Sequence, residues 1–431
     1  MLKKASFLLF IPIYLAGMSL NECINYALKE ATPIKKSQNE IEISNLNRKI
    51  QKVSEFGEID LVADYNHYNS LRTLGPLTPS TMQSGKPIPE SKDIFSVGFL
   101  YKVPLFTGFA HTNQLKIEEI AAKMSKIKRS LTKEEIIYNV KSLYLTILAQ
   151  EELLRAQRSY YKALRKLEKV VKDEVKAGRK AKIDLLKAKA QTQAILSVIE
   201  DLKAAISMTK ASLSALIGKD VKRLKRIKIH PRRVKYSTKS LLQRVAYLKK
   251  VEMDNMKIRR AQRAIKKAKA QTLPQINLSI YAGKNIGSDE VHNLGTEDSN
   301  IYQIGVHGNW ALVDFGKRSM QIQKARISKM QLELDKIQTI RNIKKSLKSA
   351  LAKIKESLGK YNKAKTEYQL SSKAQKIEYA RYKSGVSTIN DLLLAKAKKQ
   401  LSRAKLIESK YNYQKSLYYL DYILEQGTKK R

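Results

Sequence analysis

Hydrophobic residues along this chain recur with two periods, and the longer period covers most of it. Residues 110–177 contain no glycine or proline, and apolar side chains return there every three or four positions, as at Ile117 and Ile120. This spacing predicts a long helix with a coiled-coil seam, which at the usual helical rise would reach about 100 Å. Because the pattern resumes after Gly178, residues 110–217 are expected to form a pair of long helices.

The shorter period is two. Alternation of apolar and polar positions occurs in four segments: 58–68, 94–104, 275–283 and 301–312. In the first of them Ile59 and Leu61 share one face, and Asp60 lies on the other. Alternation over about ten residues is what a strand requires when one side faces lipid and the other faces water. Two ordinary hairpins of a soluble α+β domain are the alternative interpretation.

The two halves of the chain repeat one another. The segment VPLFTGFAHTNQ around Gly108 matches WALVDFGKRSMQ around Gly316, and KAGRKAKIDLLKAKAQ at Gly178 matches KSGVSTINDLLLAKAK at Gly385. The paired glycines are 208 and 207 positions apart. Two independent landmarks with nearly the same offset indicate an internal repeat of about 207 residues.

Each repeat is predicted to contain a helix, two strands and a long helix pair, in that order. The first helix is expected from Ser19, opened by the capping-box spacing Ser19-x-x-Glu22, to about Phe56, and its equivalent from Thr238 to about Thr272. The predicted connections between paired strands, 69–92 and 283–300, are polar and rich in turn-forming residues. The expected organisation is a signal peptide at 1–18, a first repeat at 19–218 with the helix pair 110–217, a basic linker at 219–237, a second repeat at 238–426 with the helix pair 316–426, and a tail at 427–431.

The N-terminal residues have the form of a secretory signal. Lys3 and Lys4 precede the apolar run 5–15, and small residues follow, so we expect cleavage between Gly17 and Leu20. The run is too short to span a bilayer, and no later segment has the roughly 18 apolar residues of a membrane helix. The single cysteine, Cys23, is expected to be a small buried residue, because Met18 stands where a lipid-bearing cysteine would be needed.

The charge is strongly basic, with 84 Lys and Arg against 39 Asp and Glu, a net charge of +45. Such an excess is typical of polyanion binding, of solvated helix faces or of proximity to anionic lipid. Most of the basic residues are interleaved with apolar ones at helical spacing, which favours solvated faces. One concentration, residues 222–239, is interpreted as a solvated connector, with a nucleic-acid-binding arm as the alternative. Because the chain is expected to be exported, we predict no nucleic-acid partner.

Strand counting predicts an oligomer. Four strands cannot close a barrel across a membrane, since the smallest bacterial barrels have eight, and open sheet edges are not tolerated in lipid. An exported chain with four amphipathic strands must therefore pool them with other copies, and three copies would provide twelve. The long helices carry charge outside their seams, so they must project into water on one side, where a ring of them would enclose a tunnel.

Three segments carry a family resemblance: LPQINLSIYAG (273–283), LVDFGKR (312–318) and YKSGVSTINDLLLAKAKKQLSRAK (382–405). In their order and doubling they resemble the TolC-like outer-membrane efflux proteins. The resemblance implies a mixed α and β homotrimer, with a 12-stranded transmembrane β-barrel in the outer membrane continued by a periplasmic α-helical coiled-coil barrel. It also implies an exit path for efflux or type I secretion, with a periplasmic adaptor and an inner-membrane pump as partners.

The resemblance also assigns site residues. The helix-pair tips at Gly178 and Gly385, with Tyr382, would face the adaptor, and a glycine suits such a tip because it adopts positive φ without strain. Asp391 matches the first of two aspartates that constrict the tunnel in the family, while Leu394 occupies the second position. A trimer would thus carry one ring of three carboxylates, which favours cations, beside an apolar ring. Asp184 is the first-repeat equivalent of Asp391, with helix capping or surface pairing as its alternative role.

Nothing in the sequence indicates an enzyme. The histidines lack metal-ligand spacing: His67, His111, His230, His292 and His307. The triplet Asp314-Phe315-Gly316 lacks the companion motifs of a kinase and is interpreted as a turn. We therefore expect no catalytic residue, cofactor or metal. A periplasmic coiled-coil adaptor or structural protein is the runner-up, although two hairpin units with little additional β-structure count against it.

Overall fold

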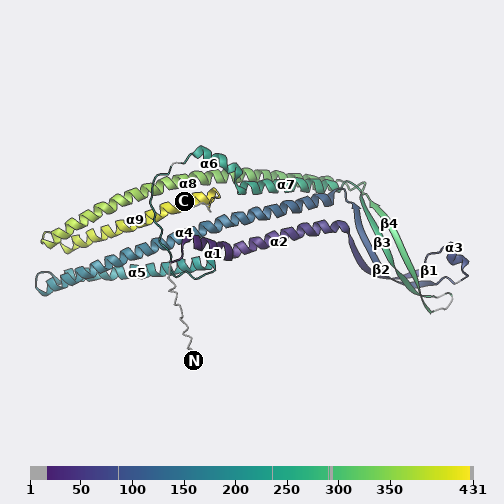
Figure 1. Ribbon diagram of the computed structural model, residues 1–431, viewed down its shortest axis with the longest axis horizontal. Helices are drawn as coiled ribbons and strands as arrows, with labels where there is room; N and C mark the ends of the chain where they lie inside the picture. Colours follow the sequence, from purple (N-terminus) through teal and green to yellow (C-terminus); the bar gives the residue numbers. More distant parts are fainter. Residues whose placement is uncertain (1–16, 86, 235, 290, 292–294, 428–431) are drawn as a thin grey trace, which may run out of the picture. The chain divides into compact units, whose positions relative to one another are not determined.

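The computed structural model describes residues 17–85, 87–234, 236–289, 291 and 295–427 (Figure 1). Most of the predicted signal peptide lies outside these residues, as do His292 and residues 428–431. The chain divides into two compact units. The helix unit consists of Met1–Gln38, Lys128–Val251 and Gln338–Arg431, and the sheet unit of Asn39–Ile127 and Glu252–Ile337. Each unit is described by itself.

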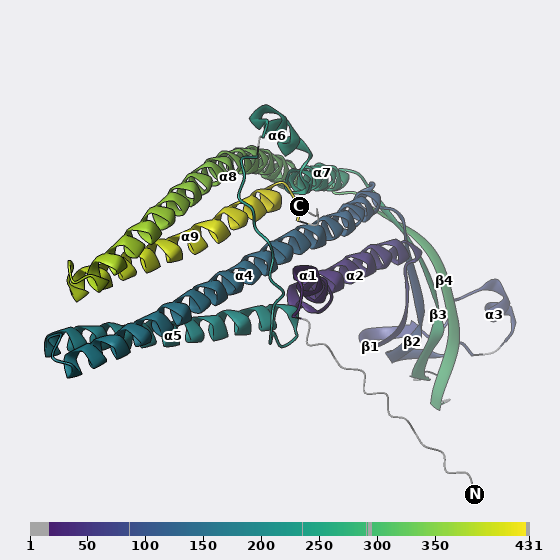
Figure 2. The ribbon, with the colours of Figure 1, turned by 60° about the vertical axis from the view of Figure 1, so that its left-hand side comes forward.

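The sheet unit contains one antiparallel sheet with the strand order β1-β2-β3-β4, whose strands lie side by side in Figure 2. The strands are β1 (Glu58–Thr73), β2 (Glu90–Phe106), β3 (Gln275–Asp289) and β4 (Gly295–Asn309). The register aligns the predicted apolar positions in rows across all four strands. One row runs from Leu61 through Phe99 and Ala282 to Tyr302. The alternation found in the sequence therefore produces one continuous apolar face.

The predicted strand ends were wrong at several points. Strand β1 was expected over 58–68 but continues to Thr73, and β3 was expected over 275–283 but continues to Asp289. Pairing persists beyond the alternating part because backbone hydrogen bonds do not require apolar side chains, so polar residues such as Asn285 and Ser299 still face each other. The other two strands also differ from 94–104 and 301–312: β2 runs from Glu90 to Phe106, and β4 from Gly295 to Asn309.

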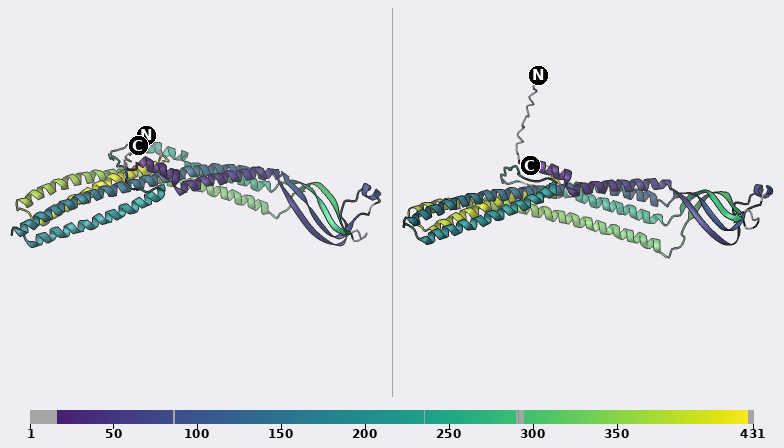
Figure 3. Two further views of the ribbon diagram at one scale, coloured as in Figure 1. Left: turned by 60° about the horizontal axis from the view of Figure 1, so that its bottom comes forward. Right: turned by 90° about the horizontal axis from the view of Figure 1, so that it is seen from below.

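Two long hairpins, visible as paired ribbons in Figure 3, account for most of the helical residues. The helices are α4 (Ala110–Lys176), α5 (Lys182–Ile217), α8 (Lys317–Lys383) and α9 (Ile389–Ile423). Helices α4 and α8 both have 67 residues, while α5 has 36 and α9 has 35. The repeat seen in the sequence is therefore a repeat of hairpins, and the corresponding helices of the two hairpins have nearly equal lengths.

The shorter helices differ from the prediction, because each expected single helix is broken. The segments are α1 (Leu20–Glu30), α2 (Thr32–Val53), α6 (Thr238–Arg244) and α7 (Lys249–Ala270), with a short helix, α3 (Pro79–Gln83), between β1 and β2. Pro33 explains the first break, since a proline is tolerated in the first turn of a helix but not in its interior. At the second break Leu248 is extended, with φ −73° and ψ 145°, and its side chain is buried in the core. The capping box of Ser19 and Glu22 is confirmed.

The core of the helix unit has three clusters. The largest surrounds Tyr144 of α4 and includes Cys23, which is fully buried as predicted. A second cluster joins Leu248 to α8 and α9. The third joins both hairpins near their tips and includes Leu164, Ile195 and Leu392. Within the described part of the chain, every helix is too short or too polar to cross a membrane.

Candidate functional sites at the helix tips and the sheet

Both hairpin tips have the same backbone geometry. Gly178 and Gly385 adopt φ values of +71° and +79°. Each lies in a double hydrogen-bond closure, in which Gly178 N and Arg179 N donate to carbonyls at Val175 and Glu174 at 3.1 and 2.9 Å. Gly385 N and Val386 N repeat the closure in the second hairpin. A Cβ at either position would meet no neighbour, so lack of space does not explain the glycines. Their left-handed backbone conformation, which favours glycine, does explain them.

Tyr382 joins the two tips. It lies near the end of α8, its side chain is 6% exposed, and its hydroxyl donates to Glu174 of α4 at 3.3 Å. The Lys180 ammonium lies 4.7 Å from the centroid of its ring. Burial, and next the negative charge of Glu174, raises the pKa of Tyr382 to about 12, so the phenol stays protonated. Sequence reasoning missed this contact between the repeats, because the two residues are 208 positions apart.

Asp391 lies in the first turn of α9 and forms a capping box with Thr388. The Thr388 hydroxyl donates to the Asp391 carboxylate at 2.6 Å and the Thr388 N–H donates to it at 3.0 Å, while Asp391 N donates to the Thr388 hydroxyl at 3.2 Å. The hydrogen bonds from the Thr388 side chain and backbone lower the pKa of Asp391. The spacing Thr388-x-x-Asp391 is a sequence signal that could have predicted this cap. The carboxylate is exposed, so capping does not remove it from solvent.

Leu394 and Asp184 have different surroundings. Leu394 lies one turn after Asp391 and is 68% exposed. Asp391 and Leu394 line a groove of about 720 Å³ between α8 and α9. Asp184 occupies the equivalent first turn of α5, but the N-cap there is Ala181, which provides no side-chain hydrogen bond. The two repeats therefore share a backbone plan at their tips and differ in how the returning helix is capped.

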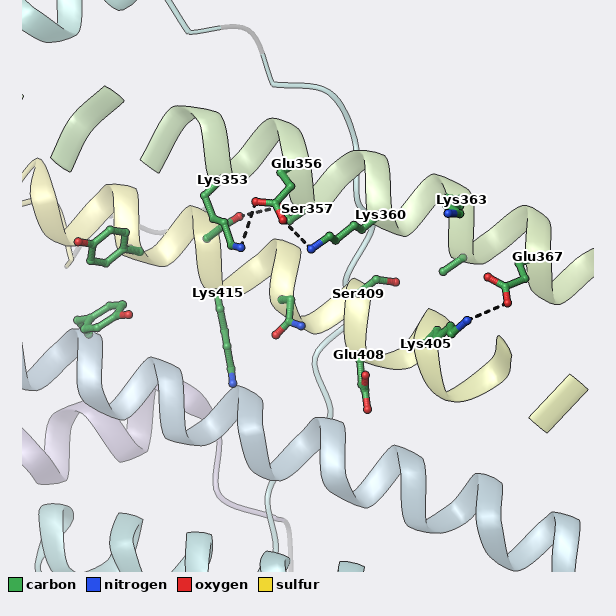
Figure 4. Close-up of a pocket in the computed structure, with 15 residues that line it drawn as sticks. Lys353, Glu356, Ser357, Lys360, Lys363, Glu367, Lys405, Glu408, Ser409 and Lys415 are labelled. Carbon is green, nitrogen blue, oxygen red and sulfur yellow. Dashed lines mark hydrogen bonds and ion pairs between the residues drawn. The ribbon is translucent and has the colours of Figure 1, made fainter. Parts of the chain in front are cut away.

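A second groove between α8 and α9, of about 710 Å³, is shown in Figure 4. Glu356 bridges Lys353 and Lys360 at 3.1 and 2.6 Å, and Lys405 pairs with Glu367 at 3.1 Å. Two of the acidic side chains at this groove are therefore paired with neighbouring lysines. In the residues that the structure describes, no group of three or more His, Cys, Asp or Glu side chains is placed to hold a metal ion.

The two faces of the sheet differ in polarity. Large apolar side chains are exposed on one face: Ile59, Leu61, Tyr65, Phe99, Tyr302, Ile304 and Val306. The other face carries polar pairs, such as Ser96 with Asn285 at 2.7 Å and Ser279 with His307 at 2.9 Å. Strands β1 and β4 are the edges of the sheet, and each pairs with one strand only in the described part of the chain. The sheet thus exposes an apolar wall and two open edges.

The strand-to-helix crossings place phenylalanines outward in both repeats. Phe109 and Phe315 have φ values of 68° and 52°, and they are 60% and 96% exposed. At the second crossing the Asp314 carboxylate accepts hydrogen bonds from Arg318 N at 2.8 Å and Gly316 N at 3.2 Å, which lower the pKa of Asp314. The triplet Asp314-Phe315-Gly316 is therefore a turn that caps α8, as interpreted from the sequence.

Comparison with known families decides what this arrangement is. The sequence profile of the outer membrane efflux protein family matches residues 23–219 and 241–424. The chain belongs to the outer membrane efflux protein family. The profile matches each half separately, so the internal repeat and the efflux function expected from the resemblance are confirmed. No curated protein matches the sequence of this family member.

Solved structures of outer-membrane proteins share its fold. The CmeC channel of Campylobacter jejuni has a TM-score of 0.77 at 16% identity, covering 95% of this chain and 86% of CmeC. VceC of Vibrio cholerae has a TM-score of 0.74 at 15% identity, covering 94% of this chain and 96% of VceC. The open state of MtrE of Neisseria gonorrhoeae has a TM-score of 0.74 at 16% identity, covering 95% and 89%.

Proposed function

We propose that three copies of this efflux protein form a duct through the outer membrane that serves as the exit path of a tripartite pump or type I secretion system. The observation that carries this proposal is the four-stranded sheet with a continuous apolar face and two unpaired edges. Lipid cannot satisfy the edge groups of β1 and β4, so they need strands from another copy. Three sheets would give twelve strands, a size known for closed barrels.

Each part of such a duct has its own environment. The apolar rows, such as Leu61 to Tyr302, would face lipid, while the polar pairs on the opposite face would line the barrel interior. The long charged helices would stand in the periplasm. A periplasmic adaptor would dock at the tips around Gly178 and Gly385, where the turn residues are exposed.

Paired substitutions test the barrel. Ile304→Lys places a charge on the apolar face of β4, and Gln303→Lys places the same charge one residue earlier on the polar face. A lysine facing the middle of the bilayer costs about 2–4 kcal/mol, so we expect Ile304→Lys to be lost from the outer-membrane fraction. Gln303→Lys should fractionate like the wild type as a trimer. A soluble wild-type monomer, which the runner-up coiled-coil adaptor predicts, would overturn the proposal.

A photo-crosslinking amino acid tests the docking site. We expect adducts with a periplasmic protein when it replaces Arg179 or Ser384 at the tips, and none when it replaces the exposed Lys355 in the middle of α8. Equal adducts from Lys355 would remove the tips as the docking site while leaving the duct itself in place.

A further inference from the structure

The basic linker between α5 and α6 runs as a segment without helix (Figure 1). Val221 and Leu224 are buried, and Ile227 and Ile229 pack against the same core around Tyr144. The apolar residues turn inward and anchor the segment to the helix unit. The sequence-based interpretation as a solvated connector is therefore incomplete, because residues 221–229 pack with one side against the core around Tyr144.

Hydrogen bonds to its backbone fix the segment further. The Tyr144 hydroxyl donates to Lys225 O at 2.5 Å. Further along, the Tyr413 hydroxyl donates to Arg232 O at 2.5 Å. A ligand that binds the segment would not have to order its backbone, which lowers the entropic cost of binding.

The cationic side chains of this segment point to solvent. We call the following seven exposed residues the basic ladder: Lys222, Arg223, Lys225, Arg226, Lys228, Arg232 and Arg233. Residues 221–234 contain no Asp or Glu. Among the described residues, none of the seven forms an ion pair, in contrast to Glu356 of α8, which bridges two lysines. Seven like charges held in a row repel one another, so folding alone does not account for them.

We propose that the basic ladder binds a linear polymer bearing repeated carboxylates, of the kind found in the peptide-crosslinked cell wall that surrounds a periplasmic protein. The inference rests on the periplasmic placement proposed above. An extended row of twelve residues spans at most about 40 Å, which suits a string of anionic groups better than one compact anion. Exposed ion pairs are individually weak, so several must form at once to hold the polymer.

The surroundings of the ladder favour this partner over two others. Insertion into a membrane surface requires an apolar face directed outward, but the large apolar residues of the segment, from Val221 to Ile229, turn inward. Binding to single-stranded nucleic acid relies on exposed aromatic rings between the charges, and residues 221–234 contain no aromatic residue except His230. A carboxylate polymer needs neither feature.

Co-sedimentation of the full-length, detergent-solubilised protein with purified cell-wall sacculi tests the proposal. The ladder variant replaces all seven residues by Gln, and the matched control replaces seven exposed lysines of α8 by Gln: Lys344, Lys345, Lys348, Lys355, Lys365, Lys373 and Lys376. We expect the wild type and the control to sediment with sacculi at low salt. The ladder variant should bind at least about tenfold more weakly. Binding of the wild type should fall as salt shortens the screening length from about 10 Å at 0.1 M to about 3 Å at 1 M.

Further binding experiments test whether the carboxylates of the sacculi are the groups that the basic ladder recognises. Sacculi whose carboxylates have been amidated should not retain the wild type. A variant with only Lys225, Arg226 and Lys228 changed to Gln should bind with intermediate strength, which covers the case in which the sevenfold variant folds poorly. Equal weakening in the control variant would overturn the proposal, because net charge alone would then explain binding. Ladder-dependent binding to anionic vesicles or to single-stranded DNA, without ladder-dependent binding to sacculi, would overturn it as well. Membrane fractionation of the same variants is read separately, so a failure of the duct proposal is recognised independently.

Discussion

The carboxylate of Asp391 accepts a hydrogen bond of 2.6 Å from the hydroxyl of Thr388, three residues before it. One side chain therefore has two possible roles, as the cap of α9 and as an exposed negative charge beside Leu394. The cap is present within a single chain, whereas a carboxylate ring requires the proposed trimer. The two roles are separable by experiment because Thr388 contributes only to the first.

Asp391→Asn should weaken cation block or cation selectivity in planar-bilayer conductance, because it removes the charge from each chain. Thr388→Val removes the capping hydroxyl, typically at a cost of about 1 kcal/mol in helix stability, but leaves the charge. We expect Thr388→Val to keep the wild-type response to divalent cations. If the conductances of the two variants change equally, the cap and not the charge is responsible, and Asp391 is not part of the constriction.

The pH dependence of cation block follows from the direction of the pKa shift at Asp391. Because the hydrogen bonds from Thr388 lower this pKa, the carboxylate remains charged below the range in which an ordinary aspartate is protonated. In the folded protein the negative charge of Asp391 is lost only as the pH falls through this lowered pKa. Cation block should therefore persist at mildly acidic pH and disappear only in strong acid. Loss of block near neutral pH would contradict this assignment.

Tyr382→Phe should destabilise the contact between the two hairpin tips. The variant loses the 3.3 Å hydrogen bond to Glu174 while keeping the buried ring, so we expect the free energy of unfolding to fall by about 0.5–1.5 kcal/mol. Chemical denaturation of wild type and variant measures the difference. Val175→Phe, in the first-repeat position equivalent to Tyr382, serves as a control for adding a ring without this bond.

Alkaline pH provides a second measurement on the same residue. The folded pKa of Tyr382 is raised to about 12, above its unfolded value, so its contribution to stability is present below the unfolded pKa. This contribution is lost as the pH rises through about 12. Wild-type stability should therefore fall more steeply than that of Tyr382→Phe over this interval. Parallel curves would show that the phenol does not titrate differently in the two states.

Cys23 should report unfolding of the core around Tyr144. It is the only cysteine, it is fully buried, and burial raises the pKa of its thiol to about 12. Because the thiolate is the reactive form, a disulfide reagent at pH 8 should not label the folded protein. Denaturant should release one reactive thiol per chain. Rapid labelling without denaturant would show that the segment from Ser19 to Glu30 opens in the native state.

Trp310 offers a test of the sheet boundary. It is the only tryptophan, it is 57% exposed, and its indole N–H donates to Thr272 O at 3.1 Å. Tryptophans of membrane barrels concentrate at the lipid–water interface. In vesicles its fluorescence should be quenched by lipids brominated near the headgroup and weakly by iodide. Full quenching by iodide with no effect of brominated lipid would place Trp310 in water.

Local sequence patterns predict the features that depend on neighbours along the chain. Period-two alternation fixed which residues share the apolar face of the sheet, from Leu61 to Tyr302, since successive side chains of a strand point to opposite sides. Spacing of three and four fixed the long helices, and the repeated glycines at 178 and 385 fixed their tips, because a left-handed turn favours a residue without Cβ. The capping box at Thr388 was equally local, and its spacing was present in the sequence.

Other features arise only where residues distant in the chain meet in the folded protein. The break at Leu248 carries no proline or glycine and depends on burial of that side chain against α8 and α9. The extra length of β1 and β3 depends on a partner strand that continues to supply hydrogen bonds after the alternation has ended. The contact between Tyr382 and Glu174, and the packing that holds the basic ladder in a row, join segments that are far apart in the chain. No local pattern encodes such contacts, because their stability comes from burial that exists only once the chain has folded.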